Sequence, residues 1–194
     1  MSKKPKLLWC GDIVAMTGFA RVTENVLKHL DDKFEICVLG HNWWGDPTPL
    51  QDRYKMFPSS NRYQTEPFGV QRIREVVERE EPDIVFTIND IWIINQQYQQ
   101  IADLHEQKKF KFVGYAPMDS YNWIGGLADT ANKWDAVISY TEFGAHEFIA
   151  GGITQPVAVI PHGMTPDQFY PMDKKEARKR LGLDPDIFIV FNGN

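Results

Sequence analysis

Cysteine is scarce in this sequence, and positive charge is in deficit. The two cysteines, Cys10 and Cys37, lie in separate apolar runs and fit neither a zinc-binding pattern nor a disulfide framework, so we expect a protein of the reducing cytoplasm with no metal site. The 21 lysines and arginines are outnumbered by 26 aspartates and glutamates, giving a net charge of −5. Proteins held to nucleic acid by bulk electrostatics carry the opposite sign, so no nucleic-acid partner is expected.

Long apolar stretches are also missing. The longest apolar window, residues 84–94, is interrupted at Asn89 and Asp90 and is far shorter than the ~20 residues that a membrane span needs. The apolar stretch behind the basic N-terminus breaks at residues 11–12, so it lacks the continuous hydrophobic region of a signal peptide. We therefore expect a soluble protein without a membrane span.

Two common nucleotide-binding motifs are absent as well. The sequence contains no G-x-G-x-x-G, and its second apolar run ends at Leu39 and Gly40 without the acidic residue that would hold an NAD ribose. It also contains no G-x-x-x-x-G-K-[ST]. Dehydrogenases and P-loop kinases or ATPases are thus disfavoured, and no bound cofactor is expected.

Short apolar runs alternate with helical patterns along most of the chain. This alternation is typical of βαβ units, and nearly continuous apolar runs are typical of strands buried on both faces. We predict a doubly wound, Rossmann-like α/β fold with a parallel sheet. The predicted strands are residues 6–10, 35–39, 84–88, 110–115, 136–139 and 157–160, with one short strand near 54–57; the predicted helices lie at 19–30, 70–77, 94–104, 141–150 and 174–181.

The character of the chain changes near its C-terminus. Prolines punctuate a stretch that holds one polar helix and a last apolar run, Ile187 to Phe191. We predict a first domain over residues 1–165, and over 166–194 a linker, a helix and the first strand of a truncated second domain. A strand without a partner is also open to pairing with a second copy of the chain, which predicts an exchanged homodimer.

Polar and aromatic residues follow the predicted strands. Ligands of open α/β sheets bind beyond the carboxyl ends of the strands, where loops diverge and helix N-termini point inward. An indole suits stacking on the C–H face of a sugar; the alternative is that these tryptophans close the top of the core. The candidate ligand-site residues are Trp43, Trp44, Asn89, Asp90, Trp92, Tyr121 and Trp123.

The loop from Gly11 to Gly18 joins the first predicted strand to the first helix. Its backbone amides and the helix N-terminus suit an anion such as phosphate, which makes Gly11, Asp12, Thr17 and Gly18 candidate phosphate-facing residues. The alternative for Gly18 is that it only lets the helix approach the sheet closely.

Asp119 is the carboxylate with the best case for a catalytic role. It follows a buried predicted strand, and the nearby Tyr121 and Trp123 are placed to desolvate it in part. The alternative is a turn-capping aspartate bonded to nearby amides, and Asp12 has the same two interpretations. His162, in a Pro-His-Gly turn, is more often a turn residue at a domain junction than a catalyst.

Several segments together resemble a known family. They are GFARVTEN at 18–25, SYTEFG at 139–144, IPHG at 160–163, FYP at 169–171 and ARKRLGL at 177–183. In their order and spacing they resemble the N-terminal half of GT-B glycosyltransferases of the retaining, family 4 type. In such enzymes the first Rossmann domain mainly binds the acceptor, the second binds the nucleotide sugar, and transfer occurs between them without an obligatory metal.

The resemblance implies roles for these residues. The Gly11 to Gly18 loop would face the donor diphosphate and acceptor, Asp119 would border the acceptor site, and His162 with Gly163 would mark the interdomain hinge. Many family members have a histidine where this chain has Asp119 and the two residues before it. The cationic clamp for the donor phosphates belongs to the family's second domain, so we expect the isolated chain to transfer little or no sugar.

A different class of function stays open. The same scaffold hosts many functions, so the chain could instead be a non-catalytic ligand-binding or assembly module.

Overall fold

The structure is a computed structural model that describes residues 3–60, 66–121 and 126–192. The chain divides into two compact units, Met1–His162 and Gly163–Asn194.

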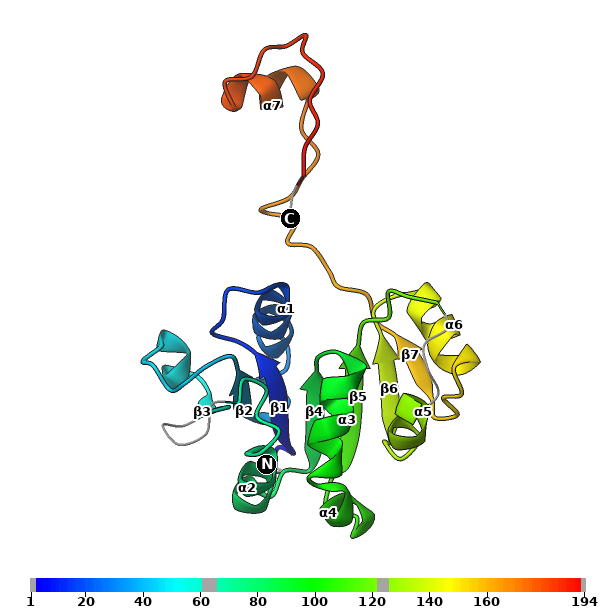
Figure 1. Cartoon of the computed structure of the whole chain (residues 1–194). Helices are drawn as coiled ribbons and strands as arrows, with labels where there is room; N and C mark the ends of the chain where they lie inside the picture. Colours follow the sequence, from blue (N-terminus) through cyan, green and yellow to red (C-terminus); the bar gives the residue numbers. More distant parts are fainter. Residues whose placement is uncertain (1–2, 61–65, 122–125, 193–194) are drawn as a thin grey trace. The chain divides into compact units, whose positions relative to one another are not determined.

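The first unit is built on one parallel sheet of seven strands (Figure 1). The strands are β1 (Lys6–Asp12), β2 (Glu35–His41), β3 (Lys55–Pro58), β4 (Ile84–Ile88), β5 (Lys111–Ala116), β6 (Ala136–Ser139) and β7 (Val157–Val159). Their order in the sheet is β3-β2-β1-β4-β5-β6-β7, and every neighbouring pair is parallel. This confirms the predicted doubly wound α/β fold.

Helices cover the two faces of this sheet unequally. In chain order they are α1 (Gly18–Leu27), the 3-10 helix η1 (Pro49–Asp52), α2 (Ile73–Glu80), α3 (Ile91–Gln99), α4 (Ala102–Glu106), α5 (Gly126–Ala131) and α6 (Glu142–Ala150). The larger core cluster joins the sheet to α2 through α6. The smaller cluster takes its helical members from α1 and η1 alone. The strands are added in one direction from β1 to β3 and in the opposite direction from β4 onward, so α1 and α3 lie on opposite faces of the sheet.

Local chemistry sets the ends of these helices. Thr17 caps α1, since its Oγ1 accepts a hydrogen bond from the Ala20 amide at 3.1 Å. Thr141 caps α6 in the same way through the Gly144 amide at 3.0 Å. α2 ends at Glu81, which adopts the left-handed region with φ 46° directly before a proline.

Three elements differ from the sequence predictions. The predicted helix 94–104 is two helices, α3 and α4, with a break at residues 100–101. α5 was not predicted. The run Ile187–Phe191, predicted as a strand, forms no strand in the described structure.

The second unit contains α7 (Lys174–Arg180), as predicted. Asp173 caps this helix by accepting hydrogen bonds from the amides of Lys175 and Glu176. The Arg178 guanidinium donates to the Asp184, Pro185 and Ile187 carbonyls and so fixes the turn that leads into the last apolar run.

No helix in the described ranges has both the length and the hydropathy required to cross a membrane.

Candidate functional site

The sheet reverses its winding between β1 and β4, which are hydrogen-bonded neighbours. Ligands of doubly wound folds bind beyond the carboxyl ends of the strands at this switch point. We call the loops that follow β1, β2, β4, β5, β6 and β7 the carboxyl edge. Gly11 is required there, because a Cβ on it would lie 2.5 Å from Ile88 Cγ2 on the neighbouring strand.

Asp12 is buried at the end of β1, and both of its oxygens accept hydrogen bonds. Thr17 Oγ1 donates to one oxygen at 2.6 Å, and Asn42 Nδ2 donates to the other at 2.8 Å. The carboxylate therefore ties the loop before α1 to the end of β2. This arrangement favours the turn-organising interpretation of Asp12 over a direct chemical role.

The N-terminus of α1 is open on the side of Gly18. A Cβ placed on Gly18 would meet no atom within 4 Å, so this glycine is not needed for close packing of helix and sheet. The preceding Met16 is fully exposed. The first-turn amides of α1 therefore have free space beside them, as an anion site at a helix N-terminus requires.

His41, which the sequence analysis did not single out, links three elements beneath this edge. The ring is fully buried; its Nδ1 lies 3.1 Å from Asn89 Nδ2 and its Nε2 lies 2.8 Å from Gln97 Nε2. Burial lowers the pKa of His41 to about 4, although the charge of Asp12 acts in the opposite direction. Asn89, predicted to line the ligand site, is itself buried and held by this network.

The loops after β4 and β5 place two carboxylates close enough for their charges to interact. Asp90 is half-buried at the start of α3, whereas Asp119 is exposed. Burial raises the pKa of Asp90, and the negative charge of Asp119 raises it further. The aspartates thus belong to one region, and Asp119 lacks the desolvation predicted for it.

Tyr140 and His162 close the β6 side of this region. The two rings pack with centroids 4.1 Å apart, and the Tyr115 ring stands edge-on to His162 at 5.6 Å. Burial lowers the pKa of His162 and raises that of Tyr140. The Tyr140 hydroxyl is buried without a hydrogen-bond partner in the described structure. His162 is thus packed between aromatic rings at the end of the first unit, and Gly163 begins the second.

The tryptophans predicted for this edge divide into buried and exposed ones. Trp43 is buried, packs over Gly40, and donates its indole N–H to the Asp46 carbonyl at 2.9 Å, so it closes the core and is not accessible to a ligand. Trp44 and Trp92 are each 51% exposed. Tyr121 is 72% exposed, with its ring edge-to-face against Phe143 at 4.9 Å. Trp123 lies outside the described residues.

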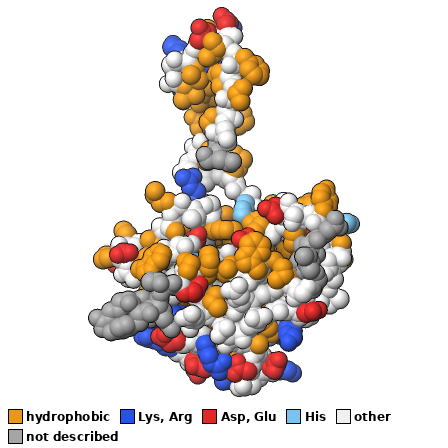
Figure 2. All heavy atoms as spheres, viewed as in Figure 1, with side chains coloured by type: hydrophobic (Ala, Val, Ile, Leu, Met, Phe, Trp, Pro, Cys, Tyr) orange, Lys and Arg blue, Asp and Glu red, His pale blue; other side chains and the backbone are white. Residues whose placement is uncertain are grey.

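Figure 2 shows the resulting surface. Hydrophobic side chains gather along the end of the first unit that carries the carboxyl edge, and charged side chains of both signs gather at the opposite end. The described residues contain no group of three or more His, Cys, Asp or Glu side chains arranged to hold a metal ion.

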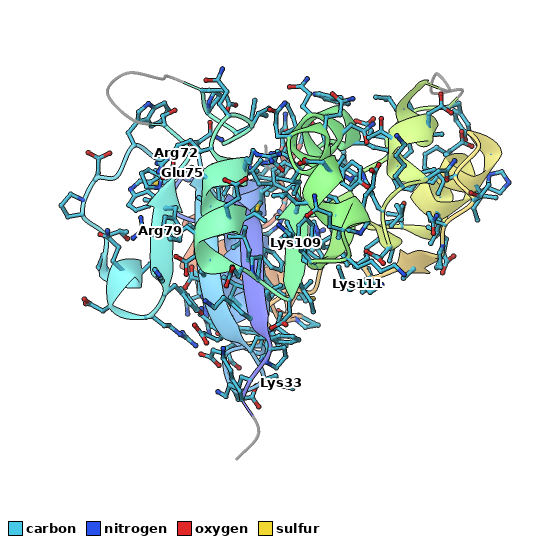
Figure 3. The ribbon with its side chains drawn as sticks, turned by 90° about the horizontal axis from the view of Figure 1, so that it is seen from below. Lys33, Arg72, Glu75, Arg79, Lys109 and Lys111 are labelled. Atoms are coloured by element: carbon cyan, nitrogen blue, oxygen red, sulfur yellow. The ribbon has the colours of Figure 1, made fainter. Side chains whose placement is uncertain are left out.

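Two open hollows, of about 530 and 740 Å³, lie at the end of the sheet where the strands begin. The larger borders a chain of hydrogen bonds in which His105 Nδ1 lies 2.8 Å from the Tyr98 hydroxyl and His105 Nε2 lies 2.7 Å from Asp135. Lys111 also donates to Asp135, and Figure 3 views this end with Lys109 and Lys111 labelled. Neither hollow borders the switch point.

Comparisons with known proteins bear on the fold. No family model matches the chain, and no curated protein matches it. Among solved structures, it is similar to the Anabaena protein HepE, whose crystal structure was determined in complex with UDP. The TM-score is 0.59 at 17% sequence identity, and the similarity covers 91% of this chain and 50% of HepE. The chain thus spans about half the length of HepE, and the likeness supports the fold alone.

Proposed function

We propose that this chain is the N-terminal, acceptor-side half of a GT-B glycosyltransferase that uses a nucleotide-sugar donor, of the retaining, family 4 type. The observation that carries the proposal is the switch point between β1 and β4, where the open N-terminus of α1 offers backbone amides to an anion. The similar HepE structure was solved with UDP, which is the nucleotide part of many sugar donors.

The chemistry of transfer explains why half of an enzyme would not suffice. The bond between the anomeric carbon and the diphosphate oxygen breaks, a bond to an acceptor hydroxyl oxygen forms, and the hydroxyl proton passes to the departing diphosphate. The departing diphosphate needs positive charge around it, and one helix N-terminus is a small supply. Residues 11–18 contain no Lys or Arg. A second domain, joined at the hinge of His162 and Gly163, would supply the cationic clamp.

The acceptor would lie on the β4 to β6 side of the carboxyl edge. There Asp119 accepts a hydrogen bond from the acceptor hydroxyl, and its exposure leaves it free to do so. Asp90 supports it from the adjacent loop. The half-exposed Trp44 and Trp92 and the exposed Tyr121 provide flat surfaces for the C–H faces of a sugar.

Titration of the ¹⁵N-labelled chain with UDP tests the donor side of this proposal. We expect amide shifts centred on residues 11–18 at millimolar UDP, and weaker shifts for the variant Gly18→Val, whose side chain projects into the open space. Gly126→Val is the matched control, since a Cβ there also meets nothing within 4 Å. Shifts distributed away from α1, or none, would contradict the assignment.

An activity assay tests the dependence on a second domain. We expect little or no transfer from a panel of nucleotide sugars by the 194-residue chain, because residues 11–18 offer no Lys or Arg to the departing diphosphate. Robust turnover by the purified chain would show that the site is complete without a second domain. Absence of UDP binding together with absence of turnover would favour the non-catalytic module.

A further inference from the structure

The β4 to β6 side of the carboxyl edge lacks positive charge. We call this region the acceptor face and define it as residues 89–92, 117–121 and 140–143. It contains no Lys or Arg, and neither do α3, α5 and α6, which flank it. Asp90, Asp119 and Glu142 are its charged members. The single Lys or Arg of α1 is Arg21, in the first turn of that helix.

The same face exposes aromatic rings rather than aliphatic side chains. Trp92 follows Asp90 by two residues in the first turn of α3, and half of its surface is accessible. Tyr121 follows Asp119 by two residues, and its ring is braced by Phe143 from the first turn of α6. Each carboxylate thus has an exposed aromatic residue two positions after it, on neighbouring loops.

Two carboxylates and one hydroxyl of the face have no hydrogen-bond partner among the described residues. No hydrogen bond or ion pair from a described residue reaches the side-chain carboxylates of Asp90 and Asp119. The negative charge of Asp119 contributes to the raised pKa of Asp90, so the pair gains from a cation brought near both. The buried Tyr140 hydroxyl, also without a partner, is in the electrostatic range of Asp90. A buried hydroxyl without a partner is costly unless a ligand completes its hydrogen bond.

We propose that the acceptor of this domain is a carbohydrate that carries a protonated amine, and that phosphorylated or carboxylated acceptors are rejected. The inference rests on the proposed function and deepens it. An ammonium group binds the two carboxylates and is attracted to the face of an indole or phenol ring, whereas an anion meets unpaired negative charge. The hydroxyls of the sugar donate to the remaining carboxylate oxygens, and its C–H face stacks on Trp92 or Tyr121.

The test uses three forms of one glucosamine tetramer: the free amine, the N-acetylated form and the N-sulfated form. These carry positive, zero and negative charge on the same rings. Their affinities for the 194-residue chain are measured by calorimetry below the pKa of the sugar amines, and the indole ¹H–¹⁵N signals locate the bound sugar. We expect the free amine to bind most tightly and the sulfated form least tightly, with the largest indole shift at Trp92.

Two variants of the exposed Asp119 make the test specific. Asp119→Asn removes one charge, and we expect about fivefold weaker binding of the free amine with little change for the acetylated form. Asp119→Lys should strengthen binding of the sulfated form. Asp52→Asn is the matched control. Asp52 is an exposed carboxylate in η1, which precedes the edge strand β3. Dispersed amide spectra verify that each variant is folded.

The outcomes separate this inference from the proposed function. Equal or tighter binding of the acetylated or sulfated form, an equal loss of all three forms in Asp119→Asn, or no binding of any form would overturn the inference. If UDP still shifts residues 11–18 in that case, the proposed function stands without it. If the free amine is preferred while UDP binds nowhere, the acceptor face is a binding site for amino sugars and the transferase proposal falls.

Discussion

His41 links the stability of the fold to pH. Burial lowers its pKa from 6.5 to about 4, so the unfolded chain takes up a proton at higher pH than the folded chain. The free energy of unfolding therefore decreases as the pH falls from 6.5 towards 4. Above pH 6.5 the ring is neutral in both states and contributes no pH dependence. The folded and unfolded pKa values differ by about 2.5, and each pKa unit is worth about 1.36 kcal/mol, so the free energy of unfolding changes by about 3 kcal/mol. The pKa of His162 is also lowered, so this residue contributes in the same direction.

We therefore expect the free energy of unfolding to decline by about 3 kcal/mol through this pH range, and His41→Gln to flatten the decline while keeping a hydrogen-bonding side chain. Urea titrations at a series of pH values measure it. His146→Gln is the control, since that side chain is exposed on α6. A His41→Gln profile as steep as that of the unmodified chain would refute the assignment to His41.

Two glycines that look alike in the sequence have opposite packing. A Cβ on Gly114 would lie 2.2 Å from the Trp134 ring, which covers β5, whereas a Cβ on Gly18 meets nothing within 4 Å. We expect Gly114→Ala to lower stability by about 1–3 kcal/mol through overpacking, and Gly18→Ala to leave it nearly unchanged. Thermal denaturation compares them. Equal melting temperatures would mean that Trp134 moves aside at no cost.

Among the helices, α1 and α6 have the same threonine cap but different neighbours. Thr141→Ala removes only the cap of α6 and should cost about 1 kcal/mol. Thr17→Ala also takes a donor from the buried Asp12 carboxylate, so its cost should be larger by about 1–3 kcal/mol. Chemical denaturation of both variants, with Thr17→Ser as a conservative partner, measures the difference. Equal losses would show that Asp12 does not depend on Thr17.

Elements with a strong apolar pattern were predictable, and short or polar ones were not. The strands of the sheet match the predicted runs to within two residues, because parallel strands buried on both faces are nearly continuous in apolar residues. α5 has only six residues, too few to show a helical period. The break between α3 and α4 falls in a polar stretch that offers no proline or glycine signal.

The carboxyl edge was predictable as a place but not as a set of contacts. Strand order puts the residues after each strand at one edge, which is why Asp90 and Asp119 could be placed there from the sequence. The bonds from His41 to Asn89 and Gln97 join residues 48 and 56 positions apart, and they depend on which strands become neighbours. Trp43 and Trp44 are adjacent in sequence, yet the left-handed turn at Asn42 sends one inward and leaves the other exposed.

Across the whole molecule, the apolar core belongs to the first unit. Every buried residue of both core clusters lies between residues 7 and 153. We therefore expect residues 1–162 alone to unfold cooperatively with nearly the melting temperature of the full chain. Differential scanning calorimetry of both lengths measures this. A marked loss of stability in the shorter chain would show that the second unit contributes to folding of the first.

The second unit leaves its last apolar run uncovered. Phe188 is 92% exposed, and Val190 and Phe191 are each 85% exposed, while Arg178 fixes the backbone that leads into them. An exposed apolar segment that is not already paired in a sheet pairs readily with another strand. We expect the 194-residue chain to shift towards dimer mass with rising concentration in light scattering, and Phe188→Lys combined with Val190→Lys to keep it monomeric. Leu181→Lys, which removes another exposed apolar side chain of the same unit, should leave association intact. A strict monomer at all concentrations would exclude pairing between copies through this run.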